Sequence, residues 1–93
     1  MIPELQDQSL VKTQAYIDGQ WVSGDGGETF PVLNPATGET LTEVTSCGAA
    51  ETRRAIEAAE AAQKHWRSLA AKDRSAVLRR WFERIMANQE DLA

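Results

Sequence analysis

The alternation of apolar and polar positions in the first half of the chain predicts short β-strands separated by tight turns. In residues 14–22, β-forming side chains stand on both sides of the pair Asp18 and Gly19. A type I′ turn needs positive φ at both of its central positions, and Asp-Gly is among the sequences that best tolerate this. We therefore predict a β-hairpin over residues 14–22.

Two further strands are predicted between this hairpin and residue 46. The first covers residues 28–33, where Pro31 has no amide hydrogen to donate and so favours an edge strand or a bulge. The second covers residues 40–46, in which Leu41 and Glu43 alternate among β-branched neighbours. Residues 14–46 are thus expected to form the hairpin and further strands.

The segment between these two strands, residues 34–39, has the composition of a turn. Pro35 keeps the preceding Asn34 out of the α region, and Gly38 can adopt a left-handed conformation. We expect the chain to reverse direction here.

At Gly48 the apolar period changes from two to 3.6 residues, which predicts an amphipathic helix over residues 49–69. Because its apolar stripe is mostly alanine, the helix can approach a sheet or another helix closely, but it buries little area by itself. Such a helix needs a packing neighbour to be stable. The stripe consists of Ala55, Ile56, Ala59, Ala62 and Trp66.

A second helix, residues 72–87, carries a wider apolar stripe and is predicted to be the main core-forming element. Asp73 in its first turn suits the helix dipole, whereas the cap position falls on Ala70 or Ala71, which have no capping side chain. The stripe consists of Val77, Leu78, Trp81, Phe82, Ile85 and Met86.

Both ends of the sequence give weaker signals. Residues 1–13 predict a short helix or an arm that rests on another part of the protein. Asn88 is predicted to cap a third helix, with Glu90 and Asp91 in its first turn. No helix-ending signal precedes Ala93, so we expect the chain to be truncated inside this element.

Composition limits the class of protein. With 93 residues, 42% of them hydrophobic and 26% charged, the chain is expected to form at most one soluble globular domain. A net charge of -4 without a dense basic cluster argues against nucleic acid as a partner. The absence of a long apolar run or a leader-like start argues against a membrane and predicts a cytoplasmic location.

The order of the predicted elements resembles the beginning of the aldehyde dehydrogenases. The most specific features are the sequence NPATGE at residues 34–39, which follows IDGQW at residues 17–21, and the helical sequences AIEAA and DRSAVL. The sequences ETRRAI and WFERIMANQEDLA are further similar to the succinate-semialdehyde branch of this family.

This resemblance implies an α/β fold in which residues 1–93 are the N-terminal part of a Rossmann-like coenzyme domain. Residues 1–13 would form an arm, residues 14–46 the hairpin and strands, and residues 47–93 the helical part. The whole enzyme would oxidise succinate semialdehyde or a related aldehyde to the acid with NAD or NADP, and would be a homo-oligomer. Which aldehyde and which coenzyme it uses stay open.

The same resemblance implies that this chain holds no catalytic, cofactor-binding or metal-binding residue, and that it is inactive alone. The family's cysteine nucleophile, its glutamate base and its pyrophosphate-binding glycines lie in motifs that are not found here. The alternative is a free-standing small α/β interaction module, in which the stripe of Trp81, Phe82 and Ile85 binds a partner helix or dimerises.

Several residues could suggest chemistry but fit a structural role better. Cys47 has no second cysteine for a disulfide or a zinc site, and His65 has no partner at metal-ligand spacing. The glycines of residues 23–27 lack the following helix that a phosphate cradle needs, since a strand is predicted there. The carbonyl of Leu33 could contribute to a monovalent-cation site in some relatives, although the other ligands would lie downstream.

The arginines and tryptophans are interpreted in the same way. The arginines alternate with acids on helical faces, which is typical of a solvated or interdomain surface, and the tryptophans are most simply core or interface residues. These residues are Arg53, Arg54, Arg79, Arg80 and Arg84, and Trp21, Trp66 and Trp81.

Overall fold

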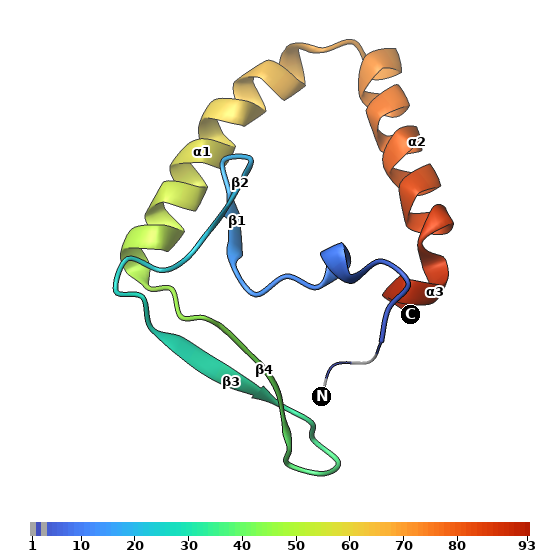
Figure 1. The fold of residues 1–93 in the computed structure, drawn as a ribbon. Helices are drawn as coiled ribbons and strands as arrows, with labels where there is room; N and C mark the ends of the chain where they lie inside the picture. Colours follow the sequence, from blue (N-terminus) through green and yellow to red (C-terminus); the bar gives the residue numbers. More distant parts are fainter. Residues whose placement is uncertain (1, 3) are drawn as a thin grey trace.

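The computed structural model describes residue 2 and residues 4–93, so residues 1 and 3 of the predicted arm lie outside the described residues. The elements form an open ring with extents of 48 × 35 × 20 Å (Figure 1). In chain order they are a 3-10 helix (Gln8–Leu10), β1 (Ala15–Ile17), β2 (Gln20–Val22), β3 (Thr29–Leu33), β4 (Thr40–Thr45), α1 (Ala49–Ser68), α2 (Ala71–Ala87) and α3 (Gln89–Leu92).

The predicted hairpin is present as the antiparallel pair β1–β2. Its two turn residues both have positive φ, 52° at Asp18 and 74° at Gly19, as a type I′ turn requires. Tyr16 lies opposite Trp21, and their ring centroids are 4.9 Å apart. The prediction for residues 14–22 is confirmed.

The two later strands pair with each other to form a second antiparallel sheet, β3–β4. A register shift between Val32 and Leu33 confirms the predicted irregularity beside Pro31, and a two-stranded sheet makes β3 an edge strand. In the connecting turn, the amide of Gly38 donates to the carbonyl of Asn34 at 2.7 Å.

The first helix, α1, ends at Ser68, close to the predicted residue 69. Its alanine face receives the hairpin, because Ala55 and Ala59 line a hollow together with Ile17 of β1. The small side chains thus permit the close approach that was expected. Ile56 does not share in this packing, since its side chain is 62% exposed, and its place in the predicted stripe is wrong.

The second helix, α2, begins at Ala71 after Ala70, which makes no side-chain cap, as predicted. Its predicted role as the main core-forming element is wrong for the described residues, among which no apolar side chain is buried. Trp81 is 64% exposed and Leu78 is 51% exposed. The physical reason is visible in Figure 1, where the hairpin lies against α1 and α2 stands apart on the other limb of the ring.

Asn88 is the N-cap residue of α3, as predicted, but its side chain makes no capping hydrogen bond. Its Nδ2 instead donates to the carbonyl of Arg84 at 2.8 Å, and its backbone amide donates to the carbonyls of Arg84 and Ile85. The prediction was therefore wrong about the function of this side chain. It satisfies carbonyls left free in the last turn of α2, because those acceptors are the nearest partners for its amide group.

Candidate functional site

Three of the features singled out in the sequence meet at the start of α1. The glycine-containing loop 23–27, Cys47 and Arg54 all surround the junction between β4 and this helix. A hollow of about 420 Å³ is lined here by residues that include Asp25, Cys47 and Glu51. This junction is the place where the chain brings these three features together.

Glu51 is the buried polar side chain of the junction, with 6% of its surface exposed. It is the third residue of α1, and its Oε2 accepts a hydrogen bond from the amide of Gly48, the residue at the N-cap. Its Oε1 accepts from the amide of Asp25 at 3.1 Å. The amides of Gly48 and Asp25 stabilise the carboxylate and lower the pKa of Glu51 to about 2.

Arg54, one turn further along α1, forms a bidentate ion pair with Asp25. Its Nη2 lies 2.7 Å from Oδ1 of Asp25, and its Nη1 donates to Oδ2 at 3.0 Å. Hydrogen bonding to Asp25, assisted by its negative charge, raises the pKa of Arg54. The loop is therefore tied to α1 twice, through the amide of Asp25 and through its carboxylate.

Gly24 brings the same loop against the end of β4. Its amide donates to Oγ1 of Thr45 at 2.6 Å, and a Cβ atom on this residue would lie 2.2 Å from the carbonyl oxygen of Ser46. Glycine is needed here for this close approach of two backbones. The amide of Gly27 donates to the carbonyl of Gly24 at 3.0 Å, so three amides of the loop donate to acceptors of the protein itself.

These contacts hold the loop against the start of α1, and we call this connection the joint at Glu51. The amides of Gly24, Asp25 and Gly27 donate to Thr45, Glu51 and Gly24, and the guanidinium of Arg54 donates to Asp25. The arrangement fixes the N-terminus of α1 to the loop before β3. That this chain holds no catalytic, cofactor-binding or metal-binding residue stays a prediction.

Cys47 and His65 are not brought together. Cys47 is an exposed free thiol just before α1, and His65 lies in the last turn of that helix. A helix of 20 residues separates the two groups by roughly 30 Å. Among the described residues there is also no group of three or more His, Cys, Asp or Glu side chains that could hold a metal ion.

Among the other arginines and tryptophans, Arg79 and Trp21 make contacts at the surface. Arg79 pairs with Glu83 at 3.4 Å and lies over the ring of Phe82. Nζ of Lys12 lies over the ring of Trp21, 5.0 Å from its centroid, in a cation–π contact. The contacts of Arg79 agree with the predicted solvated helical face. Leu33, whose carbonyl was considered above as a cation ligand, lies at the end of β3 with its side chain 52% exposed.

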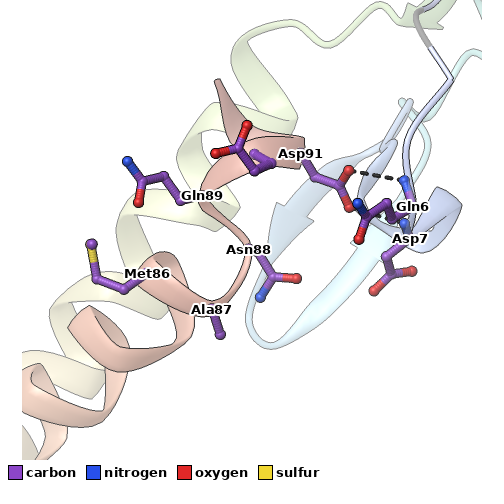
Figure 2. A pocket seen from close by; sticks show the side chains of 8 residues that line it. Gln6, Asp7, Met86, Ala87, Asn88, Gln89 and Asp91 are labelled. Carbon is purple, nitrogen blue, oxygen red and sulfur yellow. Dashed lines mark hydrogen bonds between the residues drawn. The ribbon is translucent and has the colours of Figure 1, made fainter.

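Another hollow, of about 320 Å³, lies between the N-terminal arm and the segment that joins α2 to α3 (Figure 2). Its lining includes Gln6, Asp7 and Asp91. Sequence reasoning missed both Glu51 and Asp91 as organising residues. A glutamate three residues after Gly48 is the capping signal that could have identified Glu51, whereas nothing in the local sequence connects Asp91 with an arm 85 residues away.

No helix within the described part of the chain is both long enough and apolar enough to cross a membrane.

Comparison with known proteins places these features in a family. The sequence model described as the aldehyde dehydrogenase family matches residues 21–93. Glutarate-semialdehyde dehydrogenase from Pseudomonas putida is 57% identical over 90 residues, which cover 97% of this chain and 19% of that protein. The NADP(+) succinate-semialdehyde dehydrogenase of Escherichia coli is 47% identical over the same shares of both chains.

Solved structures agree with this result. The crystal structure of succinate-semialdehyde dehydrogenase from Burkholderia pseudomallei matches with a TM-score of 0.91 and 53% identity, over 97% of this chain and 19% of that one. The chain thus spans about a fifth of the length of these relatives. The predicted α/β fold and the resemblance stated from the sequence are confirmed, and the chain belongs to the aldehyde dehydrogenase family.

Proposed function

We propose that residues 1–93 form the N-terminal part of the coenzyme-binding domain of an NAD(P)-dependent semialdehyde dehydrogenase. The observation that carries this proposal is the match to semialdehyde dehydrogenases over 97% of the chain, at 57% identity in sequence and a TM-score of 0.91 in structure. In this arrangement residues 1–13 are the arm, residues 14–46 the strands and residues 47–93 the helical part.

The exposed apolar face of α2 supports the view that further polypeptide belongs on this scaffold. Its members include Leu78, Trp81 and Phe82, which are 51%, 64% and 49% exposed. Side chains of this size gain about 1.5–3 kcal/mol each when they are fully buried. A contiguous apolar face on one helix is typical of a surface that another part of a protein covers, and we assign that role to the remainder of the enzyme.

The substrate is proposed to be an aldehyde that also carries an acidic group. The names of the relatives include glutarate-semialdehyde, succinate-semialdehyde, aspartate-semialdehyde and 3-sulfolactaldehyde dehydrogenases, whose substrates all combine an aldehyde with a carboxylate or sulfonate. Succinate semialdehyde or a close homologue fits this class. The side chains that would hold the acidic group are expected outside residues 1–93.

The coenzyme is proposed to be NAD or NADP, with NADP named for the Escherichia coli relative. Family members oxidise the aldehyde through a cysteine thiolate and transfer a hydride to the nicotinamide. We assign no step of this chemistry to a residue of this chain, which supplies packing and the joint at Glu51. A cytoplasmic homo-oligomer is the proposed state of the whole enzyme.

The alternative of a free-standing interaction module gains nothing from the comparisons, because the relatives named above are all dehydrogenases. It differs from the enzyme proposal in one simple respect. A module would need no sequence beyond residue 93, whereas the enzyme needs its cysteine and glutamate motifs there.

The test is the activity of the full-length gene product. Reduction of NAD and of NADP is followed with glutarate semialdehyde, succinate semialdehyde and an uncharged aldehyde of the same chain length as glutarate semialdehyde. We expect kcat/KM for one semialdehyde to exceed that for the uncharged control by about a hundredfold or more, because a site built for a charged group rejects an analogue without it. Equal rates would contradict the substrate class, and no reduction with any aldehyde would contradict the enzyme.

A further inference from the structure

The N-terminal arm crosses the open ring between the two limbs of the fold. Figure 1 shows it running from the neighbourhood of α3, through the short 3-10 helix, to the start of β1. The segment has few regular backbone hydrogen bonds of its own, so its path depends on contacts with distant residues. Such contacts lie at Asp91, at the apolar face of α2 and at the end of β4.

The first contact is a carboxylate that accepts two successive amides of the arm. Oδ1 of Asp91 accepts from the amide of Gln6 at 2.9 Å, and Oδ2 accepts from the amide of Asp7 at 3.0 Å. Figure 2 shows the side chain of Asp91 facing these two residues across the hollow. Both oxygens of one ionised group are thus used on the arm, and bonds to a charged acceptor are stronger than those between neutral groups.

The second contact is apolar and follows directly. Asp7 accepts from the amide of Ser9 at 3.0 Å and begins the 3-10 helix, which points the half-buried Leu10 toward α2. Leu10 lines a hollow together with Trp81 and Ile85. The arm therefore lies beside part of the apolar face of α2 that is otherwise open.

The third contact fixes the other end of the arm. The carbonyl of Thr13 accepts from the amide of Thr45, the last residue of β4, at 2.9 Å. Between Asp91 and Thr45 the arm therefore connects the far end of the helical limb with the strand that leads into α1.

We propose that residues 6–13 are a strap that holds the α2–α3 limb in place relative to the sheet, and that Asp91 is its fastening. The strap closes the ring that α1 and α2 leave open. When the carboxylate of Asp91 is removed, the strap detaches at Gln6 and Asp7 while it stays joined to β4 through Thr13. This inference concerns only the arm and stands whether or not the proposed enzymatic activity is found.

The test is hydrogen exchange measured by mass spectrometry on the full-length protein and on its Asp91→Ala variant. Two hydrogen bonds to a carboxylate are lost, so we expect exchange in peptides that contain Gln6 and Asp7 to rise about tenfold or more. The hairpin peptide, residues 15–22, should exchange as before.

The matched control is Glu90→Gln, which neutralises the neighbouring carboxylate in the same turn of α3. Glu90 makes no hydrogen bond to the described part of the arm, so its loss should leave exchange at Gln6 and Asp7 within about twofold of the parent. An increase of the same size in both variants would show a general effect of charge and would overturn the proposal. An unchanged Asp91→Ala variant would overturn it too.

The parent protein provides a second measurement if Asp91→Ala does not fold. A fastened strap requires the amides of Gln6 and Asp7 to exchange about tenfold or more slowly than the same sequence in an unstructured peptide. Unprotected amides at these two positions would overturn the proposal without any variant.

Discussion

Glu51 shows how one side chain can organise two segments that are distant in sequence. Its carboxylate accepts from Gly48 at the start of α1 and from Asp25 in the loop before β3, and it is 6% exposed. In a chain whose described residues bury no apolar side chain, such polar contacts take a larger share in fixing the structure. The pKa of Glu51 falls to about 2 because the hydrogen bonds of the fold stabilise the charged form of its carboxylate.

We predict that Glu51→Gln lowers the melting temperature at neutral pH by a few degrees, and that this difference from the parent shrinks in acid. Because the folded-state pKa is depressed, the stabilisation is complete above the ordinary value of 4.5 and is lost as the pH falls toward about 2. Thermal unfolding measured as a function of pH checks this.

Glu57→Gln is the matched control, since Glu57 lies exposed on the same helix. We expect it to behave as the parent at every pH. A gap between Glu51→Gln and the parent that stays constant from neutral pH to pH about 2 would contradict the assigned hydrogen bonds.

Gly24 and Gly26 offer a matched pair for the steric part of the joint. We predict that Gly24→Ala destabilises the protein by about 1–3 kcal/mol, because the added Cβ would lie 2.2 Å from the carbonyl oxygen of Ser46. Gly26→Ala should be nearly neutral, since the nearest atom is Cγ of Glu28 at 3.9 Å. Denaturant unfolding of both variants measures this, and equal stabilities would disprove the close approach.

At the scale of elements, most of the fold could be predicted because each signal is local. The pair Asp18 and Gly19 specifies its own turn, and the 3.6-residue period gives the limits of α1 and α2 to within one or two residues. Contacts between distant segments could not be predicted in this way. The side chain of Asn88 donates to a carbonyl of α2 and makes no bond to an amide of α3, and Asp91 accepts from amides of the arm. In both cases tertiary geometry decides among several acceptable partners.

The apolar face of α2 leads to a prediction about this element in the whole protein. Leu78→Asp should destabilise the full-length protein by about 3 kcal/mol or more, because burial of an unpaired charge is costly once the remainder of the enzyme covers this face. Ala76→Asp is the control, since Ala76 lies on the opposite side of α2 by helical geometry. Equal unfolding curves for the two variants would show that the face stays in water.

At the scale of the molecule, the structure is an open ring whose two limbs are joined by the α1–α2 turn and by the N-terminal arm (Figure 1). Its family could be inferred from the order of several motifs, because no one of them is specific enough alone. Its substrate could not be inferred, since residues 1–93 cover 19% of the relatives and we propose that the residues that recognise the acidic group lie outside this range.

We assign to residues 1–93 a scaffolding role in an aldehyde-oxidising enzyme, and Cys47 is the residue that could contradict this assignment. The decisive measurement is semialdehyde-dependent coenzyme reduction by the full-length protein and by its Cys47→Ala variant. We predict that both are active and that their kcat values agree within about twofold, because we assign the exposed thiol of Cys47 no part in the reaction. A loss of about a thousandfold or more in the variant, as expected for removal of a nucleophile, would place catalysis within these residues and contradict the account.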